Sequence, residues 1–211
     1  MNAFTALIVA YVCGSFPSAY LAGKAKGIDL RTVGSGNLGA TNVYRTLGAK
    51  IAAIVFTVDV LKGALPVWFL PRVALPPETM GTPAFTWWGL AFGIAAIVGH
   101  AKPIFLLGKG GGKGVATSAG IFLALAPAQT LAALVVFTGV LWRTGYVSAG
   151  SLTAALVLPV LLFVRGGLTS PLTIVSLLVC AFVFWSHRAN IQRLRSGTEH
   201  RFGRKKSGEG A

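Results

Sequence analysis

The chain has 211 residues, of which 54% are hydrophobic and 11% are charged, and its mean hydropathy is +0.71. A soluble domain carries about 25% charged residues, so this composition excludes a disordered protein, a coiled coil and an ordinary soluble enzyme. The 19 Lys and Arg against 5 Asp and Glu give a net charge of +14. In so apolar a chain this excess indicates membrane topology and an anionic ligand or lipid surface rather than nucleic acid.

Apolar stretches recur along the whole chain, and seven of them can be distinguished. They cover residues 4–21, 51–70, 85–98, 115–126, 127–141, 146–164 and 172–185. A helix needs about 20 apolar residues to cross a bilayer core of roughly 30 Å, and most stretches reach this length with their small or polar ends. Stretch 115–126 is too short, so it either extends into the glycine-rich loop before it or is a partial span. The pattern predicts an all-α, polytopic membrane protein with about seven transmembrane helices.

Lys and Arg are distributed unequally between the two ends of these predicted spans. With the N-terminus outside, nearly all of them fall in inside loops and in the C-terminal tail, while Arg72 and Arg165 fall outside. Because positive residues concentrate in cytoplasmic loops, we expect the N-terminus outside and the C-terminus in the cytoplasm. The prolines of residues 71–83 predict an outside loop. Residues 1–202 are expected to form one membrane domain, and the polar, glycine-rich residues 203–211 a disordered tail.

A loop of glycine and small polar residues, G-S-G-N-L-G-A-T-N, occupies residues 34–42. It contains G-x-G-x-x-G, but a dinucleotide site also needs a preceding strand and a βαβ unit, and the acidic residue at the matching distance, Asp59, lies in an apolar helix. Two interpretations remain open, a turn with capping residues or an anion site that the glycines let a ligand approach. The side chains that could donate to an anion are those of Ser35, Asn37, Thr41 and Asn42.

A second glycine-rich loop spans residues 108–114 and precedes a predicted helix. Its spacing differs from that of a Walker loop, since Lys113 is followed by Gly114 rather than by Ser or Thr. A loop that served only as a positive surface would not need five glycines around Lys109 and Lys113. Glycines let a ligand approach the backbone closely, so they favour a phosphate cradle at a helix N-terminus. The alternative is a flexible basic loop that faces lipid headgroups.

Polar residues also occur in or beside two of the predicted spans. His187 and Asn190 are three residues apart, which places them on one face of a helix; taken alone, their segment is more typical of an anchor at the membrane interface. Asp59 and Lys62 are also three apart, at a depth where charges are costly and usually paired. We therefore expect a structural ion pair between them. The His and acidic residues show no metal-ligand spacing.

These motifs together resemble those of the bacterial membrane glycerol-3-phosphate acyltransferases that use acyl-phosphate as donor. The resemblance rests on G-S-G-N-L-G-A-T-N-V-Y-R at 34–45, on G-H-A-K-P-I-F at 99–105 with G-G-K-G-V-A-T at 111–117, and on H-R-A-N-I at 187–191. The second loop departs from the family, which has a lysine at the position of Gly110, whereas Lys109 stands one residue earlier. A role therefore transfers to Lys113 more directly than to Lys109.

The resemblance implies a single seven-span acyltransferase domain in the bacterial inner membrane, with its motifs on the cytoplasmic side. The implied reaction moves a fatty acyl group from acyl-phosphate to the 1-hydroxyl of glycerol 3-phosphate and gives lysophosphatidic acid for phospholipid synthesis. It implies no metal or other cofactor, and neither acyl-CoA nor acyl carrier protein as donor. Besides its substrates and membrane lipid we expect no partner, and in particular no nucleic acid. We expect the protein to be active as a monomer.

The resemblance also implies site residues in this chain. The catalytic ones are Ser35, Lys113, His187 and Asn190. Those that bind substrate or phosphate are Gly34, Gly36, Asn37, Thr41, Asn42, Arg45, His100, Lys109, Gly111, Gly112, Gly114 and Thr117.

A function of another class, a small transporter or scramblase of organic phosphates, is compatible with Asp59 and Lys62 at membrane depth. Transport predicts polar residues along the spans, whereas here they gather at one end of them. This distribution favours chemistry at the membrane interface.

Overall fold

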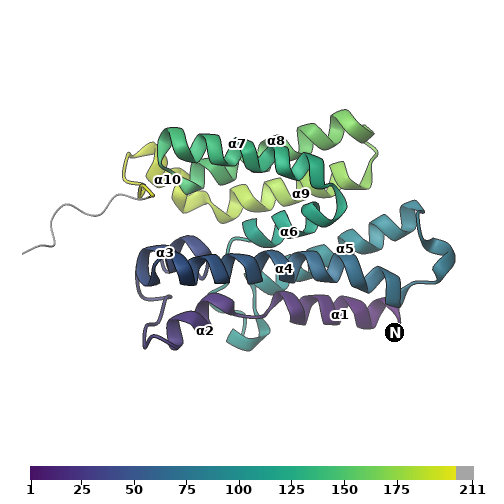
Figure 1. Ribbon diagram of the computed structural model, residues 1–211, viewed down its shortest axis with the longest axis horizontal. Helices are drawn as coiled ribbons and strands as arrows, with labels where there is room; N and C mark the ends of the chain where they lie inside the picture. The colour runs from purple at the N-terminus through teal and green to yellow at the C-terminus, as the bar shows by residue number, and fades with distance from the viewer. Residues whose placement is uncertain (203–211) are drawn as a thin grey trace, which may run out of the picture.

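The computed structural model describes residues 1–202, and its regular structure in this range is helical throughout. Figure 1 shows an elongated bundle with α1, α4 and α5 in one layer, α7, α8 and α9 in the other, and α6 between them. The all-α architecture predicted from the sequence is confirmed. The tail expected at 203–211 lies outside the described residues.

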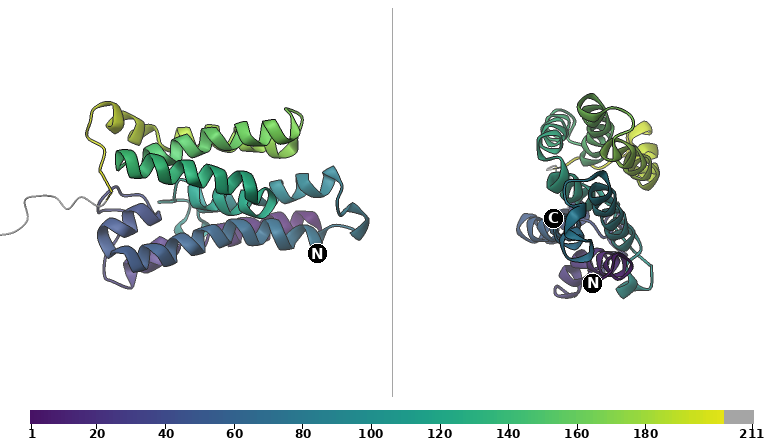
Figure 2. Two further views of the ribbon diagram at one scale, coloured as in Figure 1. Left: turned by 45° about the horizontal axis from the view of Figure 1, so that its top comes forward. Right: turned by 90° about the vertical axis from the view of Figure 1, so that its right-hand side faces the viewer.

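The long helices follow the apolar stretches of the sequence, whereas α3 and α10 lie outside them. The helix bounds are α1 (Ala3–Gly14), α2 (Ser18–Lys24), α3 (Ala40–Leu47), α4 (Ala49–Ala74), α5 (Pro83–Ala101), α6 (Val115–Leu125), α7 (Pro127–Thr144), α8 (Val147–Gly166), α9 (Pro171–Ser186) and α10 (Arg188–Arg195), with short 3₁₀ turns η1 (Pro77–Thr79) and η2 (Ile104–Leu106). The short helices α2, α3 and α10 gather at the end of the bundle away from the N-terminus, which we call the polar end (Figures 1 and 2).

The number of membrane spans stays a prediction. Four segments are long and apolar enough to cross a membrane, and the pair α9–α10, which is bent by 59°, would make a fifth. Helix α6 has only 11 residues and begins directly after Gly114, whose φ of +80° ends the loop. It is therefore too short to cross a bilayer core, and it does not extend into the glycine-rich loop.

Helices α1 and α2 together make one candidate span, Ala3–Lys24, as expected, although the helix is interrupted between them, where Pro17 lacks the N–H that a continuous helix needs. Two local expectations are wrong. Helix α4 continues through Pro71 to Ala74, so the expected outside loop starts later; in spanning helices, neighbouring groups satisfy the backbone that proline frees. The loop expected at 34–42 ends at Gly39, because residues 40–47 form the amphipathic helix α3, with Val43 buried in the core.

Close packing of α6 on α4 fixes the position of the loop that precedes α6. A side chain at Gly63 would lie 2.1 Å from the Thr117 carbonyl oxygen, and one at Gly120 would lie 2.0 Å from the Val60 carbonyl oxygen. Small residues that let backbones approach in this way are common between membrane helices. Helix α6 is thereby held between the two layers, with its N-terminus directed toward the polar end.

Candidate active site

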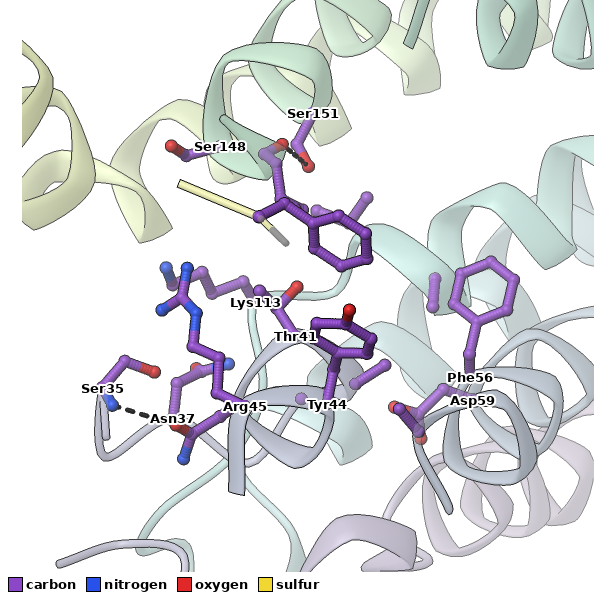
Figure 3. A pocket seen from close by; sticks show the side chains of 18 of the residues that line it. Ser35, Asn37, Thr41, Tyr44, Arg45, Phe56, Asp59, Lys113, Ser148 and Ser151 are labelled. Carbon is purple, nitrogen blue, oxygen red and sulfur yellow. Dashed lines mark hydrogen bonds between the residues drawn. The ribbon is translucent and has the colours of Figure 1, made fainter. Parts of the chain in front are cut away.

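One pocket of about 450 Å³ lies between α3 and α4 on one side and α7, α8 and the α9–α10 junction on the other. It brings all four residues expected to be catalytic together, Ser35, Lys113, His187 and Asn190. Figure 3 shows Arg45 and Lys113 reaching into the same part of it, with Ser148 and Ser151 on the wall opposite Ser35 and Tyr44. Of the expected binding residues, the lining includes Asn37, Thr41, Asn42, Arg45, His100 and Gly114, and it leaves out Gly34, Gly36, Lys109, Gly111, Gly112 and Thr117.

A chain of hydrogen bonds holds the lysine of the second loop in this pocket. The ammonium group of Lys113 donates to Asn190 Oδ1, and Asn190 Nδ2 donates to Glu199 Oε1 at 2.7 Å. Glu199 also accepts from Ser148 Oγ at 3.1 Å and from Arg193 Nε at 2.7 Å. A single carboxylate thus joins α8, α10 and the second loop, and Asn190 has both ends of its amide fixed.

The electrostatics of this network favour anion binding. Burial penalises the ammonium form of Lys113 and, together with the charge of Arg193, lowers its pKa to about 8. Burial acts to raise the pKa of Glu199, but the hydrogen bonds from Asn190, Arg193 and Ser148 outweigh it and lower that pKa. Around neutral pH, Glu199 is therefore ionised and engaged by its neighbours, while Lys113 keeps a positive charge for a ligand.

His187 lies at the bend between α9 and α10, so it does not share one continuous helix face with Asn190 as expected. Its ring caps the end of α9, since Nδ1 lies 2.8 Å from the Val183 carbonyl oxygen, which also accepts the His187 backbone N–H. A ring nitrogen beside a carbonyl acceptor carries the hydrogen. The neutral tautomer therefore has Nδ1–H and leaves Nε2 as the acceptor.

The first loop is held by Asn42 rather than by its glycines alone. The Asn42 side chain donates to the carbonyls of Leu30 and Val33 at 3.0 and 3.1 Å, and its Oδ1 accepts the Ser35 N–H at 2.9 Å. All three bonds go to the backbone of residues 30–35, so in this structure Asn42 fixes the chain that leads into the loop and presents Ser35. Ser35 itself is exposed, with its hydroxyl at the pocket.

The second loop is packed tightly against the end of α5. A side chain at Gly112 would lie 2.1 Å from His100 Nε2, and the Gly112 N–H donates to the His100 carbonyl at 3.1 Å. Ser186 Oγ holds the loop from the other layer by donating to the Lys113 carbonyl at 3.3 Å. Lys109 is exposed and Thr117 is fully buried in α6, so neither lines the pocket.

A buried polar cluster packs against the side of His100 that faces away from the second loop. Asp59 and Lys62 form the expected ion pair at 2.8 Å, and both are buried. Asp59 also accepts from Ser18 Oγ at 2.7 Å, and Lys62 donates to the Phe16 carbonyl at 3.1 Å. His100 Nδ1 lies 3.9 Å from Asp59 Oδ1, so the ring stands between this cluster and Gly112. Within residues 1–202, no group of three or more His, Cys, Asp or Glu side chains is arranged to hold a metal ion.

The pocket has an apolar side that continues into the bundle. Phe56, Val115 and Phe137 line it there. They also line a neighbouring cavity of about 110 Å³ that reaches Leu158 and Val179 between α8 and α9. Charged and apolar surfaces therefore meet in one site.

Among the lining residues that sequence reasoning did not single out, four make contacts that shape the site, namely Ser148, Glu199, Tyr44 and Phe202. Glu199 had a signal, since it is one of 5 acidic residues in a chain of net charge +14 and falls in a predicted polar terminus. Ser148 lies in a helix that reads as apolar, and Phe202 follows the last motif, so neither carried a local signal.

Comparison with known proteins adds relatives of one kind. A family model described as "Glycerol-3-phosphate acyltransferase" matches residues 4–197. A protein named glycerol-3-phosphate acyltransferase from Geotalea daltonii is 45% identical over 200 residues, covering 94% of this chain and 96% of that protein. One of the same name from Geobacter sulfurreducens is 42% identical over 203 residues, covering 96% of this chain and 98% of that protein.

Two crystal structures are similar to this chain along nearly its whole length. PlsY (YgiH), described as an integral membrane glycerol 3-phosphate acyltransferase, in its glycerol 3-phosphate form matches with a TM-score of 0.86 at 39% identity, covering 95% of this chain and 96% of that one. Its lysophosphatidic acid form matches with a TM-score of 0.83 at 37% identity, covering 95% of each chain.

Proposed function

Because the chain belongs to the glycerol-3-phosphate acyltransferase family, we propose that it moves a fatty acyl group from acyl-phosphate to the 1-hydroxyl of glycerol 3-phosphate. The products are lysophosphatidic acid and phosphate, and the reaction is the first acylation of phospholipid synthesis. One observation carries the proposal: a single pocket joins two cations, Arg45 and Lys113, to an apolar wall. In this reaction both substrates carry a phosphate group and one carries a long hydrocarbon chain.

The pocket suits both kinds of group. Lys113 and Arg45 would neutralise the two phosphates, since charge-assisted bonds to phosphate are strong in a partly buried site. Ser35 and Asn37 would orient substrate oxygens from the first loop. The acyl chain would lie along Phe56 and Phe137 and in the adjoining cavity, where burial of each CH₂ stabilises it by about 0.8 kcal/mol.

The transfer step needs positioning and charge stabilisation more than a protein nucleophile. The glycerol oxygen attacks the acyl carbon, and phosphate leaves with the electron pair of the bond that breaks. The departing phosphate is a base at the right place, so it would take the proton of the attacking hydroxyl. His187 Nε2 and Ser35 would orient this hydroxyl or a phosphate oxygen, while Lys113 stabilises the developing charge. A covalent acyl-enzyme is not required.

The proposal extends to the setting of the enzyme. The polar end would face the cytoplasm, where glycerol 3-phosphate is soluble, with the N-terminus outside the inner membrane. Residues 1–202 would form the complete catalytic unit, because all four residues expected to be catalytic line one pocket of one chain. The protein would then act as a monomer.

The test is an assay of the purified protein with palmitoyl phosphate and glycerol 3-phosphate, with lysophosphatidic acid measured as product. Palmitoyl-CoA and palmitoylated acyl carrier protein, supplied in separate reactions, are the comparison donors. Of the three donors, we expect only palmitoyl phosphate to give lysophosphatidic acid. Product from a thioester donor, with none from palmitoyl phosphate, would show that the proposed donor is wrong.

A further inference from the structure

The segment after α10 crosses the polar end of the molecule toward the other layer. We call residues 199–202 the C-terminal strap. Glu199 at its start is held by the three hydrogen bonds described above, and Phe202 at its end donates its backbone N–H to the Gly145 carbonyl at 2.7 Å. Both ends of the strap are thus fixed to the layer that contains α7 and α8.

The strap reaches α3 through two contacts. The Phe202 ring stacks on the ring of Tyr44, with centroids 4.3 Å apart and an angle of 21° between the planes. The His200 carbonyl accepts a hydrogen bond from Arg45 Nη2 at 3.4 Å. Tyr44 and Arg45 are neighbours on α3, and both line the pocket. The strap therefore contacts the helix that presents one of the two cations.

The aromatic stack stands between the pocket and solvent. Phe202 is 41% exposed and yet lines the pocket, so its ring has an outer and an inner side. Three polar side chains deeper in the same pocket are well covered, with His187 4%, Asn190 7% and Glu199 8% exposed. A phenyl ring offers no hydrogen bond that would hold a water molecule, so the Phe202 ring forms a wall of the pocket that does not bind water.

We infer that Phe202, stacked on Tyr44, determines whether the acyl group goes to glycerol 3-phosphate or to water. The inference rests on the proposed function, because an activated donor is what makes water a competitor. In transfer, the bond between the acyl carbon and the phosphate oxygen breaks, the glycerol oxygen bonds to that carbon, and the glycerol proton goes to the departing phosphate. In hydrolysis, a water oxygen takes the place of the glycerol oxygen and the product is a fatty acid. Closing a site against water suppresses this second outcome.

The experiment measures how each variant divides palmitoyl phosphate between lysophosphatidic acid and free fatty acid. It uses purified full-length protein with glycerol 3-phosphate present, and subtracts the fatty acid formed without protein. Phe202→Ala is expected to raise the hydrolysed share about three- to tenfold by opening the wall. Tyr44→Ala is expected to have a similar effect, and the double variant no further effect, since both changes remove one stack.

Trp142→Ala is the matched control, because Trp142 is an aromatic residue 86% exposed on α7 and outside this pocket. An unchanged hydrolysed share in Phe202→Ala, or an equal rise in Trp142→Ala, would overturn the inference. If Phe202→Ala fails to fold, Tyr44→Ala decides alone, since it leaves the strap unaltered. Failure of the proposed function looks different: the unaltered protein itself then makes no lysophosphatidic acid from palmitoyl phosphate.

Discussion

Two lysines of the second loop have opposite surroundings. Lys113 is partly buried and bonds to Asn190, whereas Lys109 is exposed and lies outside the pocket. A charge beside a partly desolvated phosphate contributes far more than one in water. The sequence already favoured Lys113, because Gly110 stands where the family has its first lysine.

We predict that Lys113→Ala lowers kcat/KM by about 30- to 1,000-fold, equivalent to roughly 2–4 kcal/mol of lost transition-state stabilisation. Lys109→Ala is the matched control, and should lower kcat/KM by less than about threefold because an exposed charge is well screened. Steady-state kinetics of the two purified variants check this. Equal losses in the two variants would contradict the assignment of Lys113 to the site.

The pH dependence should report on the same lysine. Its pKa is lowered to about 8, so the ammonium form is present below that pH and is lost above it. We therefore expect kcat/KM for glycerol 3-phosphate to fall as the pH rises through about 8. Lys113→Arg should move this alkaline limb upward, since a guanidinium stays protonated there. An alkaline limb that Lys113→Arg leaves in place would have to belong to another group.

At the scale of elements, the second loop depends on glycine at a position where the neighbouring ring cannot easily yield. His100 is buried between Asp59 and Gly112, and a side chain at Gly112 would lie 2.1 Å from its Nε2. We predict that Gly112→Ala shifts the loop and lowers kcat/KM by about 10- to 100-fold, because a displacement of about 1 Å can have this effect on a positioned group.

The matched control for this substitution is Gly139→Ala on α7, where nothing lies within 4 Å of the added carbon. It should leave activity unchanged and should stabilise rather than strain its helix. Thermal unfolding in detergent distinguishes a displaced loop from a misfolded protein. Unaltered activity in Gly112→Ala would mean that the His100 ring moves aside and that the loop is not held by it.

Elements with a strong apolar pattern could be predicted from the sequence, and those formed by tertiary contacts could not. The long helices start and end within a few residues of the apolar stretches, because in an apolar environment the backbone N–H and C=O groups must bond to one another, and a helix achieves this within one segment. Helix α3 was missed because its eight residues, seen alone, look like capping residues and turns. The bend at His187 was missed because it depends on a ring bond to Val183.

The candidate site divides in the same way. Lys113, Ser35, Asn190 and His187 could be found because each sits in a motif beside a predicted span. Glu199 and Phe202 reach the site only because the chain folds back after α10, which no local pattern predicts. The role of Asn42, whose amide bonds to the backbone of Leu30, Val33 and Ser35, likewise appears only in three dimensions.

For the whole molecule, orientation in the membrane can be tested with single cysteines. Glu78→Cys places a thiol at an exposed position in the connection between α4 and α5, and Ser196→Cys places one directly after α10, in a background of Cys13→Ala and Cys180→Ala. The α4–α5 connection and α10 lie at opposite ends of the bundle (Figure 1). Because Lys and Arg gather at the polar end, a membrane-impermeant thiol reagent should label Glu78→Cys in intact cells. It should label Ser196→Cys only after permeabilisation. The reverse pattern would invert the proposed topology, and labelling of both in intact cells would contradict it.

The break between α1 and α2 has a consequence for the synthesis and membrane insertion of the protein. The Phe16 carbonyl and the Ser18 hydroxyl are the hydrogen-bond partners of Lys62 and Asp59, and they are synthesised some forty residues earlier. When α4 leaves the ribosome, the groups that satisfy its two charges are therefore already in the bilayer, where an unsatisfied charge is costly. The order of synthesis therefore favours correct assembly, because α1 and α2 are present before α4 inserts. In a circularly permuted protein that makes α1 and α2 last, Asp59 and Lys62 would enter the membrane without these hydrogen-bond partners.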